Sequence, residues 1–304
     1  MAHRLFAIFV IIPIIRTMKE YISVSPVEYS NTEFSSLILR FEVLNSIYTS
    51  FEKSRIVFVT SESGQNSVIK IPAKPRGASR EWEGLKKAYK AGVLVPEPLA
   101  LVTTENGKAA LISKYIEGSV LYKNTDMQLR SKMGVAISGM HESVAINGKE
   151  WSKSGKPTFI YYDRSLFEWS RKNGDQLGTK GKLQEIIKKF TTTASSYCEV
   201  STPVFNHNDL HEGQIIVSSK GDVILLDFEN WTEDTKLNDM AYYLFQLIRT
   251  NTSFENYKVF LEGYLGTDDL MDSDKAVLSF YLLFISARAL NYFITTKSKH
   301  LNIA

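Results

Sequence analysis

The segment 207–229 constrains the fold of this chain more than any other part of the sequence. It contains two apolar runs that flank a polar turn centred on Lys220-Gly221. Apolar runs on either side of a glycine-containing turn predict an antiparallel hairpin. If the strands pair symmetrically about this turn, Gln214 and Asp227 lie opposite each other at the open end, about 5 Å apart.

The open end of this hairpin is rich in oxygen-bearing side chains. Asp209 precedes Gln214 by five residues in a loop, so we expect it to lie near Gln214 and Asp227. Carboxylates held close together repel each other unless a cation or a basic group lies between them. Because amide and carboxylate oxygens are ligands that Mg²⁺ accepts, the hairpin predicts a magnesium site.

The first part of the chain is expected to be rich in strands. Runs 55–59 and 67–71 are typical of strands, and Asn106-Gly107 predicts the turn of a further hairpin. Apolar residues at helical spacing predict a helix at 32–51.

A second helix, amphipathic, is predicted at 79–91. Ser79 is expected to cap its N-terminus and Gly92 to end it. Beyond Glu117 the pattern becomes mostly helical. The predicted helices of this second part are 128–144, 165–173, 182–197, 239–249, 253–265 and 274–296. The change predicts two lobes, 1–116 and 117–304, with a ligand-binding cleft between them.

Composition limits the functional classes. The chain has 304 residues and a formal net charge of +3, which gives no whole-chain case for binding nucleic acid or a membrane surface. Its only cysteine is Cys198, so no intrachain disulfide forms and a reducing, cytoplasmic setting is favoured. The apolar segment 5–15 is shorter than the roughly 20 residues that a membrane-spanning helix needs. We expect it to be a buried strand or a segment docked on the body of the protein, with a signal peptide or membrane anchor as the less favoured alternative.

The sequence HNDLHEGQ, followed by LLDFE, resembles the paired H-x-D-x-x-x-x-N and D-F-G/E motifs of the kinase-like superfamily. The resemblance is closest to the aminoglycoside phosphotransferase and choline kinase group. It implies an α+β, bilobal protein-kinase-like fold, with a small antiparallel-sheet lobe and a larger helical lobe. It also implies that Asp209 orients an acceptor hydroxyl and takes its proton, while Gln214 and Asp227 hold Mg²⁺ on the phosphates of ATP. Gln214 departs from the family pattern, which has asparagine there.

The same resemblance assigns nucleotide-binding roles in the first lobe. Lys70 matches the strand lysine that contacts phosphates, and Glu81 matches the helix glutamate that positions it, with Glu83 as the alternative if the register differs. Ser63 and Gly64 are expected to contact phosphates in a glycine-poor loop. Backbone groups at Ser113 and Tyr115 are expected to meet the adenine.

In the second lobe the resemblance leaves further roles open. Asp239 either supports the catalytic loop or caps a helix. His207 is expected to be structural, and His211 is a candidate for contact with the substrate.

Three functions remain compatible with the sequence. The first is an ATP-dependent kinase of a small-molecule alcohol, favoured by the long helical interval between Glu117 and His207. The second is an atypical protein kinase of the RIO type. The third is a nucleotide-binding pseudokinase scaffold, favoured by Gln214. The acceptor stays open: aromatic residues suit a choline-like cation, and Glu212, Glu229, Glu233 and Asp234 suit the acidic mouth of an aminoglycoside site. The oligomeric state is not predicted.

Overall fold

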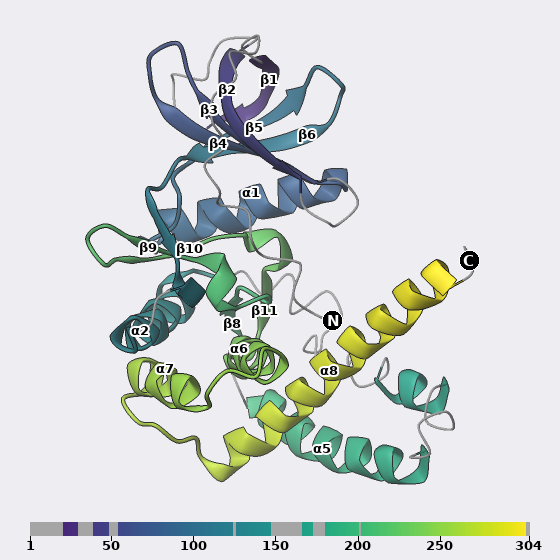
Figure 1. The fold of residues 1–304 in the computed structure, drawn as a ribbon. Helices are drawn as coiled ribbons and strands as arrows, with labels where there is room; N and C mark the ends of the chain where they lie inside the picture. Colours follow the sequence, from purple (N-terminus) through teal and green to yellow (C-terminus); the bar gives the residue numbers. More distant parts are fainter. Residues whose placement is uncertain are drawn as a thin grey trace.

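The computed structural model of the protein describes residues 21–29, 39–48, 54–123, 126–146, 166–172, 180–200 and 202–301. A strand-rich lobe lies above a helical lobe, with one helix between them (Figure 1). This is the predicted α+β, bilobal arrangement. The segment 5–15 lies outside the described residues. No helix among the described residues is long and apolar enough to cross a membrane.

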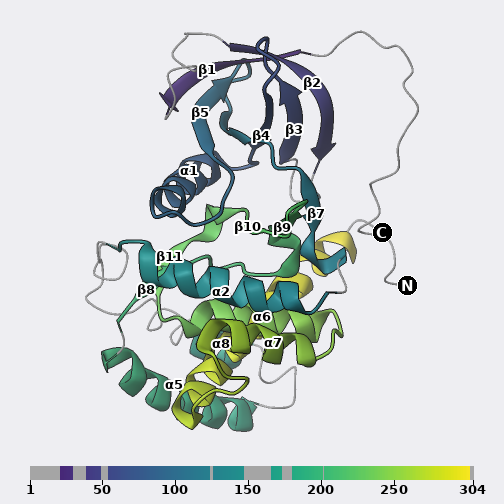
Figure 2. The same cartoon turned by 90° about the vertical axis from the view of Figure 1, so that its left-hand side faces the viewer.

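The first lobe is a closed antiparallel barrel with the strand order β1-β2-β3-β4-β6-β5 (Figure 2). Its strands are β1 (Tyr21–Tyr29), β2 (Leu39–Tyr48), β3 (Arg55–Thr60), β4 (Asn66–Ile71), β5 (Pro98–Thr104) and β6 (Ala109–Lys114). Side chains that alternate along these strands, such as Val57, Val59 and Ile69, fill the barrel. The opposite faces of β3 and β4 therefore look out of the barrel. The predicted hairpin turn at Asn106-Gly107 joins β5 and β6, and Gly107 has a φ of 72°.

The predicted helix at 32–51 is wrong, because residues 39–48 form β2. This strand pairs with β1 on one side and β3 on the other. A bulge between Val43 and Asn45 shifts the register and leaves Leu44 56% exposed. The bulge interrupts the alternation of apolar residues, so the sequence shows a spacing that resembles that of a helix.

Helix α1 (Pro75–Lys90) lies between the two lobes. It begins earlier than predicted, with Pro75 in the first turn and Lys74 at the N-cap, so Ser79 lies inside the helix and is not its cap. Gly92, at a φ of 80°, follows its end as predicted. Apolar residues of α1, including Trp82 and Leu85, belong to the core cluster of the helical lobe. The side chains of α1 therefore connect the two lobes.

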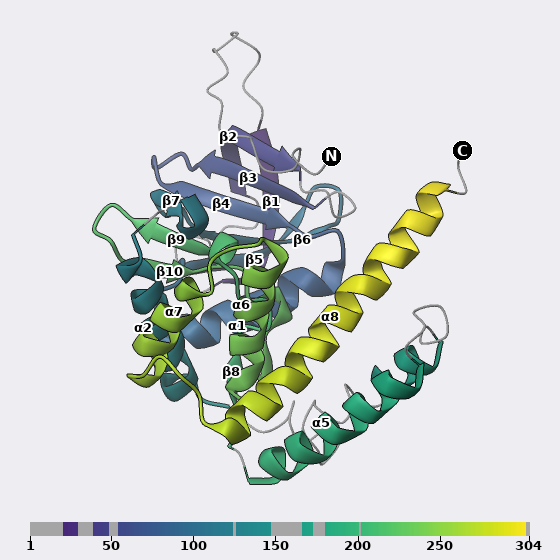
Figure 3. The ribbon, with the colours of Figure 1, turned by 60° about the horizontal axis from the view of Figure 1, so that its bottom comes forward.

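The helical lobe contains the predicted helices at closely similar positions. They are α2 (Gln128–Ser143), helix 166–172, α5 (Lys180–Val200), α6 (Leu237–Arg249), α7 (Glu255–Leu265) and α8 (Asp272–Leu301). Figure 3 shows α2 and α7 on one side of α6, and α8 with α5 on the other. Cys198 lies in α5.

Short strands and single 3-10 turns connect these helices. The strands are β7 (Gly118–Val120), β8 (Val204–Asn206), β9 (Ile215–Ser218), β10 (Val223–Leu225) and β11 (Thr232–Asp234), and the turns are η2 (Leu121–Lys123), η3 (Glu212–Gln214) and η4 (Phe228–Asn230). Strand β7 follows the barrel directly and pairs with β9 of the helical lobe. The division of the chain at 116/117 stays a prediction.

Two glycines allow α2 and α7 to pack with their backbones in direct contact. A Cβ atom at Gly134 of α2 would overlap with the carbonyl oxygen of Phe260, and one at Gly263 of α7 would overlap with that of Ser131. Backbone atoms cannot move aside as a flexible side chain can. The short distance between the helices therefore depends on the absence of side chains at these two positions.

We expect Gly134→Ala to destabilise the protein by about 1–3 kcal/mol, since the added methyl group overpacks this contact. Gly139→Ala is the matched control in the same helix, because a Cβ there meets no atom within 4 Å. Alanine favours a helix over glycine, so this control should gain about 0.5–1 kcal/mol. Chemical unfolding measures both values, and equal effects of the two substitutions would contradict the packing argument.

Candidate active site

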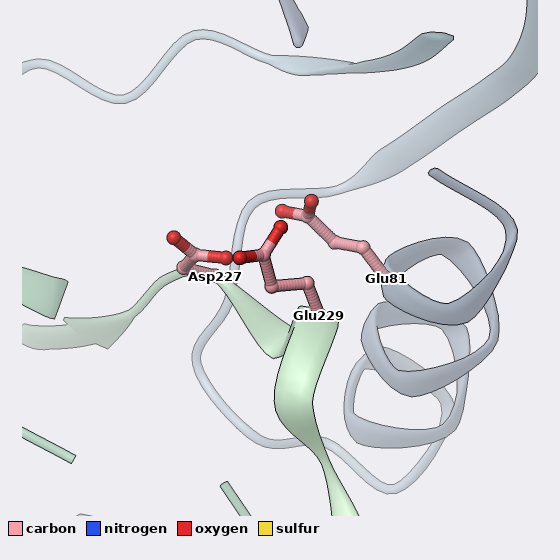
Figure 4. Close-up of side chains that lie close together, drawn as sticks. All are labelled: Glu81, Asp227 and Glu229. Carbon is pink, nitrogen blue, oxygen red and sulfur yellow. The ribbon is translucent and has the colours of Figure 1, made fainter. Parts of the chain in front are cut away.

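A lysine of the barrel holds three carboxylates together where the barrel, α1 and the segment after β10 meet. Nζ of Lys70 on β4 lies 2.9 Å from Oε2 of Glu81, 2.6 Å from Oδ1 of Asp227 and 3.6 Å from Oε2 of Glu229. Figure 4 shows the three acids converging, Glu81 from α1 and the other two from the segment after β10. The predicted contact between Lys70 and Glu81 is therefore present. Glu83 is exposed on α1.

Burial and charge set the ionisation of this cluster. Burial raises the pKa of Glu81 to about 7, although the ammonium of Lys70 opposes the shift. Burial would lower the pKa of Lys70, but the facing carboxylates raise it well above its ordinary value. Burial also disfavours the charged form of Asp227, yet Lys70 lowers the pKa of that carboxyl below its usual range. One ammonium thus faces three acids, which leaves an excess of negative charge.

The donor set of this cluster fits a hard cation such as Mg²⁺. One oxygen each from Glu81, Asp227 and Glu229 lies within 4.8 Å of the other two. Magnesium prefers such carboxylate oxygens, and its charge would offset the excess of acid. The sequence prediction did not assign Glu229 to the metal. Its place two residues after Asp227 in the LLDFE run was the available signal.

Gln214 and Asp227 meet, but not through the predicted strand register. The register pairs Val217 with Val223 and Ile215 with Leu225, so the hairpin is symmetric about Lys220 alone. The backbone of Gln214 therefore faces Leu226, and the prediction that Gln214 lies directly opposite Asp227 is wrong.

A turn of the backbone restores the contact between the two side chains. Asp227 has a φ of 63°, in the left-handed region that residues other than glycine seldom occupy. In this conformation its Oδ2 accepts a hydrogen bond of 3.0 Å from Nε2 of Gln214. The strained residue is therefore the one expected to hold the metal, and strain of this kind is common at functional sites.

Asp239 fixes the backbone of the loop that contains Asp209. Its carboxylate accepts the N–H groups of His207 at 2.8 Å and Asn208 at 2.7 Å. It also lies 3.0 Å from Nε2 of His141 on α2. Asp239 is the third residue of α6, whose N-cap is Lys236, so it is not a helix cap. These contacts favour the supporting role over the capping role.

His207 is fully buried beneath the same loop. Its Nε2 donates to the carbonyl oxygen of Leu226 at 2.6 Å, and its ring packs against Phe228. The imidazole joins the catalytic loop to the end of the hairpin. The expected structural role of His207 agrees with these contacts.

Asp209 is the one acid of the predicted site that makes no pairing contact. Its carboxylate is half-buried and has no hydrogen bond or ion pair with any residue that the structure describes. Burial raises the pKa of Asp209 to about 6, and the nearby charges of Asp227 and Glu229 add to the rise against the opposing effect of His207. A half-buried, unpaired carboxylate is able to accept a proton from a ligand.

The acidic mouth expected from four residues is not present as such. Glu212 is buried in a two-point contact with Arg130, at 3.0 and 2.8 Å, and also accepts the hydroxyl of Tyr243. Glu233 and Asp234 are fully buried, and Glu229 belongs to the lysine cluster. Three of the four acids are therefore buried in the lobe, and the side chain of Glu229, at 38% exposure, is the one that meets solvent.

His211 lies at the start of η3, next to the catalytic loop. Its Nδ1 accepts the N–H of Gly213 at 3.0 Å, which places the ring proton on Nε2. Burial lowers the pKa of His211 to about 4, so the ring is neutral near pH 7. The side chain therefore offers a neutral donor to a ligand.

Ser63 and Gly64 lie in the turn between β3 and β4, where Gly64 has a φ of 82°. Lys70 lies at the opposite end of β4 and pairs with Ile56 near the start of β3. Strand residues advance about 3.3 Å each, so the turn is more than about 13 Å from Lys70. The structure does not bring this turn to the lysine, and the phosphate-binding assignment of Ser63 and Gly64 stays a prediction without geometric support.

Ser113 and Tyr115 lie where the chain leaves the barrel. The N–H of Tyr115 already donates to the carbonyl of Asn66 at 3.2 Å. The ring of Tyr115 stands edge-on to Phe58, beside a hollow of about 260 Å³. The adenine assignment stays a prediction; of its two residues, Tyr115 lines this hollow.

Trp231 joins α1 to the segment after β10, a role that the sequence did not indicate. Trp231 donates from its indole to the carbonyl of Arg80 at 2.9 Å, and its own carbonyl accepts from the guanidinium of Arg80. A Cβ at Gly84 would overlap with the rings and side chains of Trp231 and Phe228. The close contact of α1 with this segment positions Glu81 beside Asp227. No local sequence pattern marks such a contact, because its two sides are about 150 residues apart.

We expect Lys70→Met to destabilise the protein by about 3–5 kcal/mol at pH 8, since it leaves buried carboxylates without their cation. Lowering the pH to 5 protonates the acids and should reduce this loss. Lys114→Met is the matched control, because Lys114 is 53% exposed and faces Glu97 at 3.6 Å. Its effect should stay within about 1 kcal/mol at both pH values. Urea unfolding at pH 5 and 8 measures the difference, and a loss independent of pH would contradict the charge argument.

Comparisons with known proteins bear on the family and the fold of the chain. A sequence model described as "Phosphotransferase enzyme family" (APH) matches residues 50–277. A comparison with curated proteins gave no match.

Solved structures show the same fold at low sequence identity. An aminoglycoside phosphotransferase from Alicyclobacillus acidocaldarius is 16% identical over 83% of each chain, with a TM-score of 0.55. An ethanolamine kinase from Plasmodium vivax is 17% identical over 82% of this chain and 73% of its own, with a TM-score of 0.58. The spectinomycin phosphotransferase APH(9)-Ia, in complex with ADP and spectinomycin, is 14% identical over 79% and 78%, with a TM-score of 0.55.

These structures confirm the predicted kinase-like fold. Because the matching family model spans most of the sequence and includes the motifs around Asp209 and Asp227, the chain belongs to the phosphotransferase enzyme family.

Proposed function

We propose that this protein transfers the γ-phosphoryl group of ATP to a hydroxyl of a small molecule, with Asp209 as the catalytic base. The observation that carries the proposal is that the acids of the candidate site differ in their pairing. Asp227 and Glu81 are paired with Lys70, whereas Asp209 has no partner among the described residues. Pairing holds the first two in place, and its absence leaves Asp209 able to react.

The reaction is an in-line displacement at phosphorus. Asp209 accepts a hydrogen bond from the acceptor hydroxyl and then takes its proton. The acceptor oxygen forms a bond to the γ-phosphorus as the bond from that phosphorus to the β,γ-bridging oxygen breaks, and ADP leaves with the electron pair. Lys70 contacts the phosphates, where its fixed charge stabilises negative charge in the transition state.

Asp227 and Glu229 of the acidic cluster would hold Mg²⁺ together with Gln214, while Glu81 stays paired with Lys70. When bound there, the cation would neutralise charge on the phosphates of ATP. Gln214 now donates its amide N–H to Asp227, so its amide must turn to present oxygen to a cation. Two relatives in the same structural group support nucleotide and divalent-cation use: one was solved with ADP, and an amicoumacin kinase was solved with AMP-PNP and Ca²⁺.

The acceptor is proposed to be a small molecule and not a protein or a nucleic acid. The relatives named above include kinases of spectinomycin and ethanolamine, and none is a RIO-type protein kinase. The net charge of +3 provides no whole-chain attraction for nucleic acid. The single cysteine supports a cytoplasmic, reducing compartment.

We expect Asp209→Asn to lower kcat by about 10²–10⁴-fold, because the amide cannot take the proton. Binding of Mg²⁺-ATP, measured by calorimetry, should remain, since Lys70 and Asp227 are unchanged. The exposed Asp268 provides a matched control, and Asp268→Asn should leave both values unchanged. Full turnover in the Asp209 variant would contradict its role. Nucleotide binding without turnover in the unchanged protein would favour the pseudokinase alternative.

The pH profile should follow Asp209. Because burial raises the pKa of Asp209 to about 6, kcat/KM should fall as the pH drops through 6 and level off above 7. The same raised pKa means that the native charge costs stability above pH 6, so Asp209→Asn should be about 1–2 kcal/mol more stable than the unchanged protein at pH 8. That gain should vanish below pH 4, where both states of the unchanged protein are protonated. Nucleotide affinity measured at each pH separates the ionisation of ATP from that of the enzyme.

A further inference from the structure

A cation on α8 contacts α6, the helix whose Asp239 supports the loop of the proposed catalytic base. Arg288 lies on α8, which packs against α6, and its guanidinium donates to the hydroxyl of Tyr242 on α6 at 3.1 Å. The guanidinium also lies 5.7 Å from the ring centre of Phe284. The tyrosine is buried, whereas Arg288 is exposed. The arginine therefore reaches from a packed helix interface towards solvent.

Tyr242 lies one turn along α6 from Asp239, on the same face of the helix, and Asp239 accepts the N–H of Asn208, the residue before Asp209, at 2.7 Å. Burial raises the pKa of Tyr242 to about 12, the charge of Arg288 opposes this rise, and the charge of Asp209 adds to it. Arg288 also lowers the pKa of Asp209. Arg288 and the loop of Asp209 therefore meet the same face of α6, and no ion pair joins Arg288 to Asp209 within the described part of the chain.

The charges of Asp239 and Asp234 also act on Tyr242, but Asp239 is engaged with His141 and Asp234 with Tyr281. Within the residues that the structure describes, no carboxylate forms an ion pair with Arg288. A second exposed cation, Arg249 at the end of α6, lowers the pKa of His211. The acids that would have formed an acidic mouth are buried or belong to the lysine cluster.

We propose that the acceptor is an anionic alcohol, whose carboxylate or phosphate group binds Arg288 while its hydroxyl lies at Asp209. This inference rests on the proposed function and adds the class of its acceptor. A guanidinium presents paired N–H donors that match the oxygens of a carboxylate or a phosphate. The hydroxyl of Tyr242 accepts a hydrogen bond from one guanidinium nitrogen of Arg288 and so positions the guanidinium. A choline-like or aminoglycoside-like cation would instead be repelled by Arg288.

The experiment compares four probes that share a hydroxyl group and differ in charge. D-Glycerate carries a carboxylate, glycerol 3-phosphate carries a phosphate, glycerol is neutral and choline is cationic. Phosphoryl transfer to each is followed by ADP release. Binding of each is measured by calorimetry, with and without a non-hydrolysable ATP analogue. The protein is the full chain, as the unchanged form, as Arg288→Gln and as Lys220→Gln.

Lys220→Gln is the matched control, because it removes the same charge from an exposed hairpin turn. We expect at least one anionic probe to bind more tightly than glycerol and choline. Arg288→Gln should weaken that binding at least about tenfold, as loss of a charged hydrogen-bonding group does. It should leave the affinity for the ATP analogue unchanged, and the control should match the unchanged protein. A preference for glycerate over glycerol 3-phosphate, or the reverse, identifies the anionic group.

Three results would overturn the anionic acceptor. The first is a preference for choline or glycerol over both anions. The second is anion binding that Arg288→Gln does not weaken, and the third is no anion binding at all. If the unchanged protein neither binds nucleotide nor transfers phosphoryl groups, the proposed function is contradicted. The binding measurement without nucleotide still decides the role of Arg288 in that event.

Discussion

The candidate site depends on the ion pairs that the ammonium of Lys70 makes with three carboxylates. The lysine comes from the barrel, while the acids around it come from α1 and from the segment after β10. Without that charge, three carboxylates in a largely buried place would repel one another and the two lobes would lose a shared contact. The same lysine is the group expected to contact the phosphates of ATP. Arrival of a cation and phosphates would therefore redistribute charges that already hold the lobes together.

A second network leaves Asp209 free by occupying its neighbours. Asp239 accepts the two backbone amides before Asp209, and His207 is fastened to the end of the hairpin. The position of Asp209 is thus set through the backbone, and its carboxylate needs no partner of its own. An unpaired, half-buried acid reduces stability, as its raised pKa shows. The fold accepts that cost at the one acid whose proposed role is to take up a proton.

The sequence was informative where spacing along the chain reflects distance in space. The hairpin of 207–229, the end of α1 at Gly92 and the contact of Lys70 with Glu81 follow from local patterns and from the family motif. The register of the hairpin was wrong by one residue, since apolar runs of this length fit either register, and the left-handed φ of Asp227 compensates for the shift. Strand β2 looked helical because its bulge at Leu44 interrupts the alternation.

Contacts between distant parts of the chain were not readable in this way. Glu212 lies in a sequence typical of a solvated loop. Only the fold reveals that Arg130, 82 residues away, donates hydrogen bonds to both of its carboxylate oxygens. Trp231 and Gly84 likewise acquire their roles only when α1 packs on the segment after β10. Arg288 lies about 80 residues beyond Asp209, and the sequence pattern around it predicts only that this segment is a helix. The charge of the acceptor region was therefore the part of the site that spacing could not provide.

The distribution of charge around Asp209 explains why an anionic acceptor would need a cation such as Arg288. ATP brings several negative charges to one side of Asp209, where Lys70 and the proposed metal site offset them. An anionic acceptor that approaches from the other side meets repulsion from those phosphates, and this repulsion grows as the reacting oxygens come together. A fixed cation on the acceptor side offsets it and also places the hydroxyl with respect to Asp209. A cationic acceptor would be attracted by the phosphates without such help, so an exposed arginine beside the base would only weaken its binding.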